Sequence, residues 1–485
     1  MKKTIRLKQI AALSLLTALF AVPAFAAEGE EPVLLSWTGD CETTMTFSWQ
    51  SESRADAAVQ VVPEYQYQAS GFAGALEFPA AVKDVSLDGS GAWRCQAAAS
   101  GLEPDTVYVY RVGSQDAWSE PGSFTTRAAG SASLTFAYLG DAQTANDTAA
   151  DYAVWGDWIE TIYQRSPELA FAVLGGDNVN SGISLDEFRL FTQNAGRVFS
   201  SVPLFSAIGN HESNFIGGKA ELFLDWFAFP ENGPEGFEEE FYSFDAANCH
   251  VLVLNSWIFS GEQPLAGEDY QRVNDWIAAD LASSTADWQV VITHVPVYQV
   301  HSDTTAAKVK ENWAPIFERY GVDLVFEGHQ HVYSRSYPMY QGKTDYENGI
   351  TYIMGVSGGK HYDSADETFA ARTVYEVSTC QIVQIDGNLL TVQTIDPQGN
   401  ELDFVSIPQR EVSVSRGEYI ETLWKAAGAP APKGGSPFAD TDSPAAVWAC
   451  EAGIVQGCGN GKFAPDEPVT PWQIDLILER MGETK

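Results

Sequence analysis

The sequence predicts an α/β protein with three parts: an N-terminal β-sandwich, a central αββα domain in which two sheets pack between helices, and a small C-terminal helical region. Three observations lead to this prediction. Strand-like alternation fills residues 31–127, apolar runs alternate with helical stretches over residues 132–408, and a short repeat marks residues 411–485. A length of 485 residues is enough for several domains.

Residues 1–26 have the pattern of a secretion signal. Four basic residues precede an apolar stretch over residues 10–22, and Ala24-Phe25-Ala26 fits a cleavage site. The apolar stretch is too short to span a bilayer stably. We therefore expect a protein without a transmembrane anchor that is secreted or held at the cell surface.

Residues 31–127 consist of short runs in which apolar and polar side chains alternate, as in half-buried strands. Thr44–Trp49 and Thr106–Val112 are two such runs, and Gly, Pro, Asp and Ser separate them. The region contains no recognisable catalytic pattern, so we expect an all-β domain with a structural role. Residues 127–133 are expected to be a short linker.

Five apolar runs in the central region each end in a polar residue that can bind a metal ion. Those residues are Asp141, Asp177, Asn210, His294, and the pair His329 and His331. The runs predict buried strands, and the adjacent glycines allow sharp turns. Loops at strand ends are where open sheets place their sites. Packing explains one such residue but not five runs, so we predict a single site.

The donor types favour hard or borderline divalent ions. Carboxylates, amide oxygens and imidazoles suit Zn, Fe, Mn or Mg. The candidate ligands outnumber the needs of one ion, and a carboxylate can bridge two ions about 3.5–4 Å apart. The sequence therefore predicts two divalent metal ions (Fe, Zn or Mn).

The rest of the central region alternates helices and strands, as a layered α/β domain requires. Glu268–Leu281 and Trp313–Tyr320 have helical apolar spacing, and residues 381–407 return to strand alternation around a turn at Asp386. At the C-terminus, residues 414–423 align with residues 469–478. This repeat predicts two related helices.

Composition restricts the partners of the protein. A formal charge of −37 repels nucleic acid and anionic membranes, so neither is expected as a binding partner. Six cysteines in an exported chain permit disulfides. Pairing within each region is the simplest arrangement, and six free thiols are the alternative; the regional pairs are Cys41 with Cys95, Cys249 with Cys380, and Cys450 with Cys458.

The five motifs together resemble the five blocks of the calcineurin-like metallophosphoesterases, and most of all those of the purple acid phosphatases. They are Gly140-Asp141, Gly176-Asp177, Gly209-Asn210-His211-Glu212, Val291-Ile292-Thr293-His294 and Gly328-His329-Gln330-His331. The resemblance covers roughly residues 31–408, and its motifs are specific as a set.

The resemblance implies a role for each site residue. Asp141 and His331 would hold the first metal, Asp177 would bridge, and the second metal would be held by Asn210, His294 and His329. His211 would face the phosphate as a catalytic residue, with Glu212 orienting it. His301 is a second catalytic candidate, with a solvated loop residue as the alternative.

The chain departs from the purple acid phosphatase pattern at two positions. Asn180 stands where the family has the tyrosine that binds Fe(III), so a purple Fe(III)-tyrosinate centre is not expected. Tyr138 should point into the sheet rather than at the metals. Gln143 stands where related branches have a histidine ligand. Gln143 or Asn180 could supply an oxygen to the first metal, waters could fill the position, or both side chains could act only as outer hydrogen-bonding groups.

The flanking regions resemble two accessory modules. Ser100–Tyr110 is similar to the turn and strand of fibronectin type III domains, which purple acid phosphatase-like chains carry before the catalytic domain. Residues 411–485 resemble S-layer homology modules, which attach bacterial proteins to cell-wall polymers. Arg416 keeps the basic residue of that motif, whereas Pro471 replaces it in the second copy. Attachment to a Gram-positive cell wall and a vestigial helical cap remain alternatives.

These expectations lead to a secreted hydrolase of phosphate esters, similar to the acid phosphatases that act on monoesters. The two ions would supply the nucleophile and neutralise phosphoryl oxygens, while His211 or His301 assists the leaving group. One alternative is a phosphodiesterase or nucleotidase that uses the same site. The other is a non-catalytic cell-wall-binding protein, which the complete ligand set disfavours.

Overall fold

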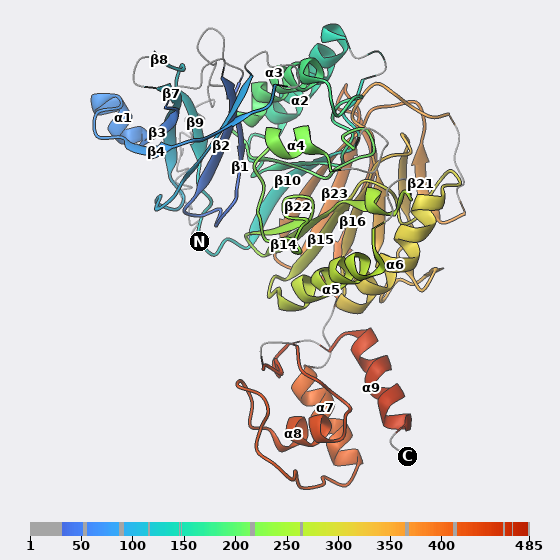
Figure 1. Ribbon diagram of the computed structural model, residues 1–485. Coiled ribbons are helices and arrows are strands. Elements are labelled where there is room, and N and C mark those ends of the chain that lie inside the picture. The colour runs from blue at the N-terminus through green and yellow to red at the C-terminus, as the bar shows by residue number, and fades with distance from the viewer. Residues whose placement is uncertain are drawn as a thin grey trace, which may run out of the picture.

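The structure is a computed structural model, and Figure 1 shows its three parts along the chain. It describes residues 32–51, 56–86, 92–114, 117–144, 146, 148–213, 219–261, 265–363, 368–410, 415–458, 461–467 and 469–483. The secretion signal expected at residues 1–26 lies outside these ranges. Within the described ranges, no helix has both the length and the apolar character needed to cross a membrane.

The N-terminal part is built from two antiparallel sheets. One has the order β1-β2-β6-β5, and the other has the order β4-β3-β7-β8 with β9 also pairing with β7. The strands are β1 (Leu34–Ser36), β2 (Met45–Ser51), β3 (Ala58–Pro63), β4 (Leu76–Pro79), β5 (Ala81–Asp84), β6 (Trp93–Ala99), β7 (Val107–Ser114), β8 (Ala117–Trp118) and β9 (Gly122–Thr125). A short helix, α1 (Glu64–Ser70), follows β3, so the prediction that this part is entirely β is wrong at that point.

The N-terminal sheets share one apolar core with the central domain. Trp37 follows β1, and its ring lies 5.7 Å from that of Phe171 and 5.6 Å from that of Phe205. The buried Arg94 of β6 donates a 2.6 Å hydrogen bond to the carbonyl oxygen of Trp226. Because side chains of both parts complete the same core, the N-terminal sheets are an integral layer of the molecule.

Two sheets form the centre of the molecule. The six-stranded sheet has the order β12-β11-β10-β22-β23-β24, and the seven-stranded sheet has the order β13-β14-β15-β16-β20-β17-β21. Their strands are β10 (Ser133–Leu139), β11 (Ala172–Leu174), β12 (Leu204–Ser206), β13 (Tyr242–Ala246), β14 (Cys249–Leu254), β15 (Trp288–Thr293), β16 (Leu324–Glu327), β17 (Tyr333–Ser336), β20 (Thr351–Met354), β21 (Ala370–Val374), β22 (Cys380–Asp386), β23 (Leu389–Ile395) and β24 (Glu401–Pro408). A hairpin of β18 (Met339–Tyr340) and β19 (Lys343–Thr344) follows β17.

Side chains of the seven-stranded sheet alternate between two apolar cores, one on each face, which establishes the predicted αββα layering. Val290 and Ile292 of β15 belong to the core shared with the six-stranded sheet, whereas Val291 between them packs in a second core with helical side chains. Helices α2 (Ala149–Arg165), α3 (Leu185–Phe199) and α4 (Glu221–Trp226) contribute to the first core. The short helix η1 (Ser256–Phe259), α5 (Gly267–Ser283) and α6 (Thr304–Tyr320) contribute to the second. Figure 1 shows α5 and α6 covering the outer face of this sheet.

The C-terminal part has a small core of its own around Ile420 and Phe463. Its helices are α7 (Arg416–Ala426), α8 (Pro444–Glu451) and α9 (Pro471–Glu483), and α7 and α9 begin at equivalent positions of the repeat. The Arg416 guanidinium donates a 2.7 Å hydrogen bond to the carbonyl oxygen of Phe463, so this basic group is engaged within the module. Arg410 ties the preceding segment to the end of α6 by hydrogen bonds to the carbonyl oxygens of Gly321 and Val322.

All six cysteines lie within the described ranges, and all carry free thiols, so the predicted regional pairing is wrong in this structure. Cys249 begins β14 and Cys380 begins β22, which belong to different sheets. Cys41, Cys95, Cys249 and Cys380 are buried in apolar surroundings. They therefore act as small hydrophobic residues of the core.

Candidate metal centre

The predicted ligands lie at neighbouring strand ends of the two sheets. Strands β10, β11 and β12 run parallel and precede Asp141, Asp177 and Asn210, respectively. Strands β15 and β16 are also parallel and precede His294 and the pair His329 and His331. The carboxyl ends of parallel strands meet at one edge of a sheet. The αββα packing therefore brings two such edges together over one site.

At two positions before the ligands, a carboxylate lies so close to the backbone that only glycine fits. A Cβ atom at Gly209 would lie 2.1 Å from Asp177 Oδ1, and one at Gly328 would lie 2.3 Å from Asp141 Oδ1. Neither glycine has a positive φ. At these two positions the expected role in turning the chain is wrong, and the glycines instead leave room for the aspartates. Gly176, before Asp177, does turn the chain as expected, with a φ of 88°.

Sharp turns also occur at three of the ligands themselves. Asp177, His329 and His331 have φ angles of 52°, 71° and 42°, a region that non-glycine residues rarely adopt. Such conformations cost about 1–3 kcal/mol each and cluster at functional sites. The fold thus holds three predicted ligands in a conformation that other side chains and backbone groups must stabilise.

A continuous set of donor atoms defines the predicted second metal position. Asp177 Oδ2 lies 3.3 Å from His294 Nε2, which in turn lies 3.0 Å from Asn210 Oδ1. His329 Nδ1 lies 2.8 Å from the same Asn210 oxygen. Donor atoms of Asp177, His294 and His329 all fall within 4.8 Å of one another. These separations suit oxygen and nitrogen atoms that surround one ion.

The predicted first metal position is adjacent. His331 Nε2 lies 3.4 Å from Asp141 Oδ2, and the Gln143 amide lies 3.2 Å from Asp177 Oδ2. Asp177 Oδ1 accepts a 2.8 Å hydrogen bond from the backbone N–H of His211. This bond leaves Asp177 Oδ2 between the two groups of donors, the position that a bridging carboxylate requires.

Each of the three predicted ligand histidines has one ring nitrogen bound by an acceptor. His294 Nδ1 donates to the carbonyl oxygen of Gly175 (2.8 Å), and His331 Nδ1 donates to that of Lys360 (3.0 Å). His329 Nε2 lies 3.0 Å from Asp303 Oδ2. The opposite nitrogen therefore faces the site as a lone-pair donor, the arrangement that metal-binding histidines use. The residues present fit two metal ions.

Electrostatics at this edge favour positive charge. Asp141 and Asp177 are at most 1% exposed. Burial opposes ionisation of Asp177, but the neighbouring His294 and His211 rings hold its pKa below the usual range. Burial also opposes a charged His294, yet Asp177 raises the pKa of that ring to about 10. Buried carboxylates that attract a proton onto a nearby ring attract a metal cation for the same reason.

His211 lies beside the predicted bridging residue, Asp177, but its ring is oriented by Asn180 rather than by Glu212 as expected. Its Nδ1 donates a 2.6 Å hydrogen bond to the carbonyl oxygen of Asn180, and its Nε2 lies 3.8 Å from Asp177 Oδ2. The Glu212 carboxylate instead accepts hydrogen bonds from the backbone amides of Asp177, Asn178 and Gly209, at 2.7–2.8 Å. The Glu212 carboxylate thus contacts backbone amides rather than the His211 imidazole. It therefore holds together the loop that carries Asp177 and the loop that carries Asn210.

His301 lies on the rim next to Tyr362 rather than among the donor atoms. Its ring centroid is 5.3 Å from that of Tyr362, which is also 5.1 Å from the ring of His331. The backbone N–H of His301 donates to Gln330 Oε1 (2.9 Å), which holds the loop against the motif that carries His331. The structure thus places His301 and Tyr362 beside the first metal position.

One further residue, Asp303, was outside the sequence predictions. Asp303 contacts His329 through Oδ2 and caps α6 through Oδ1, which accepts a 2.6 Å hydrogen bond from the backbone N–H of Thr305. The Asp-Thr-Thr sequence is a helix N-cap signal, but nothing local links it to a histidine 26 residues away. Tyr138 donates to the carbonyl oxygen of Glu327 and stacks on Phe326, so it points between the sheets as expected.

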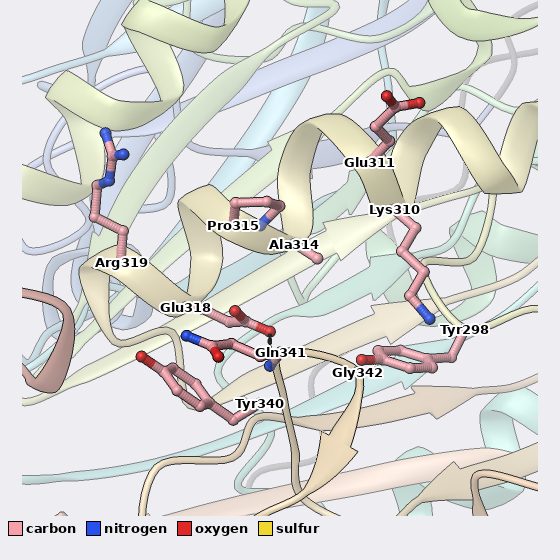
Figure 2. A pocket seen from close by; sticks show the side chains of 10 residues that line it. All are labelled: Tyr298, Lys310, Glu311, Ala314, Pro315, Glu318, Arg319, Tyr340, Gln341 and Gly342. Atoms are coloured by element: carbon pink, nitrogen blue, oxygen red, sulfur yellow. Dashed lines mark hydrogen bonds between the residues drawn. The ribbon is translucent and has the colours of Figure 1, made fainter. Parts of the chain in front are cut away.

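A cavity of about 440 Å³ lies elsewhere, between α6 and the β18–β19 hairpin (Figure 2). Two of its charged groups contact other residues of the cavity wall. Lys310 lies over the Tyr298 ring at 3.9 Å, and Glu318 accepts a 2.7 Å hydrogen bond from the backbone N–H of Gln341. None of its lining residues is a predicted ligand, so we assign no chemistry to this cavity.

Comparison with known proteins agrees with this geometry. Residues 134–333 match the family model described as calcineurin-like phosphoesterase, and residues 31–126 match the model described as purple acid phosphatase, N-terminal domain. The central domain is thus a calcineurin-like metallophosphoesterase domain that follows a purple acid phosphatase N-terminal domain. Metal-dependent phosphoester hydrolases are the class that this fold and sequence resemble.

Individual relatives belong to the same class. Purple acid phosphatase 15 of Arabidopsis thaliana is 29% identical over 301 residues, which are 55% of this chain and 54% of that protein. Phosphoenolpyruvate phosphatase of Allium cepa is 28% identical over 282 residues, covering 55% and 53%. The chain therefore spans about half the length of the curated relatives it matches.

Solved structures show the same fold. The purple acid phosphatase PPD1 from yellow lupin seeds superposes with a TM-score of 0.63 and 16% identity, over 78% of this chain and 74% of that one. PhoD superposes with a TM-score of 0.55 and 12% identity, over 77% and 92%.

Proposed function

We propose that this protein is a secreted, two-metal hydrolase of phosphate esters that acts on monoesters. The observation that carries the proposal is the position of Asp177 Oδ2, which lies 3.3 Å from His294 Nε2 and 3.2 Å from the Gln143 amide. A buried carboxylate oxygen between two sets of donors is suited to two cations. Purple acid phosphatases among the relatives support the reaction class.

The protein residues have distinct tasks in this proposal. Asp141 and His331 would hold one ion, Asn210, His294 and His329 would hold the other, and Asp177 would contribute to both. When bound, the ions supply a nucleophile at neutral pH and stabilise charge on the phosphoryl group. His211, fixed through Nδ1 by the Asn180 carbonyl oxygen, presents Nε2 beside the bridge, where it can hold a proton for the departing oxygen.

His301 is the alternative proton donor. It sits beside Tyr362 near His331, on the side of the first ion, whereas His211 contacts the bridge. A group that touches the leaving oxygen contributes about 10²–10⁴ in rate. The two histidines can therefore be separated by their effects on substrates with good and poor leaving groups.

The other parts of the proposal concern location and organisation. Residues 1–26 would direct export, residues 31–127 and 132–408 would form the catalytic unit, and residues 411–485 would attach the protein to a cell-wall polymer. Because Arg416 is engaged with Phe463 inside the module, wall contact would have to use other surface groups. Sedimentation of the protein with purified cell walls, with and without residues 411–485, tests this attachment.

A screen of the purified protein tests the activity. Loaded in turn with Mn, Zn or Fe, it should hydrolyse phosphate monoesters faster than diesters. His211→Ala should slow esters of poor leaving groups much more than activated aryl esters, whereas His301→Ala should change the two alike. A preference for diesters or nucleotides would favour the alternative activity on the same site. Bound metal without hydrolysis of any phosphate ester would refute the proposal.

A further inference from the structure

Gln143 lies among the donor atoms of the first metal position. Its side chain is 1% exposed, and its Nε2 lies 3.2 Å from Asp177 Oδ2 and 3.4 Å from His331 Nε2. The backbone N–H of Gln143 donates a 2.8 Å hydrogen bond to the carbonyl oxygen of Asp177. This bond ties the Gln143 backbone to the loop that carries the bridging carboxylate.

A purely hydrogen-bonding role leaves this amide half satisfied. With the nitrogen facing Asp177, the side-chain oxygen of Gln143 is buried and has no hydrogen-bond partner. An unsatisfied buried polar atom costs about 1–3 kcal/mol. The oxygen and nitrogen of an amide are interchangeable in shape, and only the surrounding interactions decide which one faces a given neighbour.

Rotating the amide by half a turn would place the oxygen against a carboxylate oxygen and a histidine lone pair. Three lone-pair donors face one another favourably only around a cation. Donor atoms bound at about 2.0–2.2 Å to one ion lie roughly 3.0–3.5 Å apart. The separations from the Gln143 amide to Asp177 Oδ2 and His331 Nε2, 3.2 and 3.4 Å, fall in this range.

We propose that the side-chain oxygen of Gln143 is the fourth protein ligand of the first metal ion, together with Asp141, Asp177 and His331. The inference rests on the proposed two-metal function. Its chemical consequence is a site with two carboxylates, one imidazole and one neutral amide. Such a donor set carries no phenolate to stabilise a trivalent ion, so the first position selects a divalent metal.

Metal affinity tests this assignment without reference to turnover. Titration of the metal-free protein with Zn²⁺ or Mn²⁺ should resolve two binding events. Gln143→Leu should weaken one of them by at least ~10²-fold, the upper end of the loss seen when even an outer partner of a ligand is removed. The other event should change much less.

Gln381 offers a matched control. It is a buried glutamine of β22 that also has an unpartnered side-chain oxygen, and its nitrogen donates to Thr379 Oγ1. Gln381→Leu removes the same group elsewhere in the core and should leave both binding events unchanged. Equal metal affinities in wild type and Gln143→Leu would overturn the assignment.

A crystal structure of the wild-type protein with Zn²⁺ or Mn²⁺ decides the point even if Gln143→Leu does not fold. We expect an amide oxygen within about 2.3 Å of the ion held by Asp141 and His331. An ion at that position with the Gln143 side chain beyond hydrogen-bond distance would overturn this inference alone. A wild-type protein that binds no second ion would instead refute the proposed function itself.

Discussion

Replacing Glu212 with Gln should destabilise the ligand-bearing loops. The wild-type carboxylate accepts from four backbone amides: Oε2 from Asp177 and Gly209 (both 2.8 Å), and Oε1 from Asn178 (2.7 Å) and Val179 (3.4 Å). A carboxamide has one oxygen, so its NH₂ group must face the two N–H groups that the other carboxylate oxygen accepted from. Two buried donors then lack acceptors, at about 1–3 kcal/mol each.

The expected loss is therefore roughly 2–6 kcal/mol, or on the order of 10 °C in the melting temperature of a domain of this size. Differential scanning calorimetry of the metal-free protein measures it. Glu240→Gln is the control, because Glu240 is also buried but accepts from Asn255 Nδ2, a bond that an amide oxygen can keep. If Glu212→Gln lowers the melting temperature no more than Glu240→Gln does, Glu212 does not hold the two ligand-bearing loops together as described.

Three other predictions concern Asp303, His250 and Asn180. Asp303→Asn should weaken metal binding by about 10–100-fold in a chelator competition. The single amide oxygen cannot both cap α6 and accept a hydrogen bond from His329 Nε2. Unchanged metal affinity would exclude a role of Asp303 in orienting His329. Burial opposes protonation of His250, but hydrogen bonds to Asp245 and Asp280 raise its pKa from 6.5 to about 9. The protonated ring therefore stabilises the folded protein fully below pH 6.5, and this stabilisation is lost as the pH rises through 9. His250→Gln should therefore lower the free energy of unfolding by on the order of 2 kcal/mol at pH 6, given that Asp245 is largely exposed, and the difference should vanish above pH 9 in urea titrations. The metal-loaded wild type should be colourless, and Asn180→Tyr loaded with Fe(III) should gain a visible charge-transfer band; a purple wild type would show that another tyrosine reaches the metals.

Local sequence was sufficient to locate the candidate ligands. Each one follows an apolar run, and a strand places its last residues at the sheet edge whatever lies around it. The layered fold followed from the same alternation, and so did α5 and the three strands after residue 380. These features depend on periodicity within a single segment, which is why they could be predicted.

Other features depend on contacts between distant segments, and the sequence could not specify them. The link between Asp303 and His329 requires the loop before α6 to fold back over the site. The hydrogen bond from the backbone N–H of Asp177 to Glu212 requires two strand-end loops to meet. The packing of Trp37 against the rings of Phe171 and Phe205 joins two parts that the sequence presents as separate domains.

Metal stoichiometry in the Asp177→Asn variant tests the central claim most directly. Elemental analysis of the metal-loaded wild type should give two ions per chain, together with hydrolysis of a phosphate monoester. Asp177→Asn keeps the shape of the side chain but removes the bridging charge, so it should lose at least one ion and hydrolyse the ester orders of magnitude more slowly, while far-UV circular dichroism stays unchanged. Two bound ions and near-normal turnover in Asp177→Asn would contradict the account.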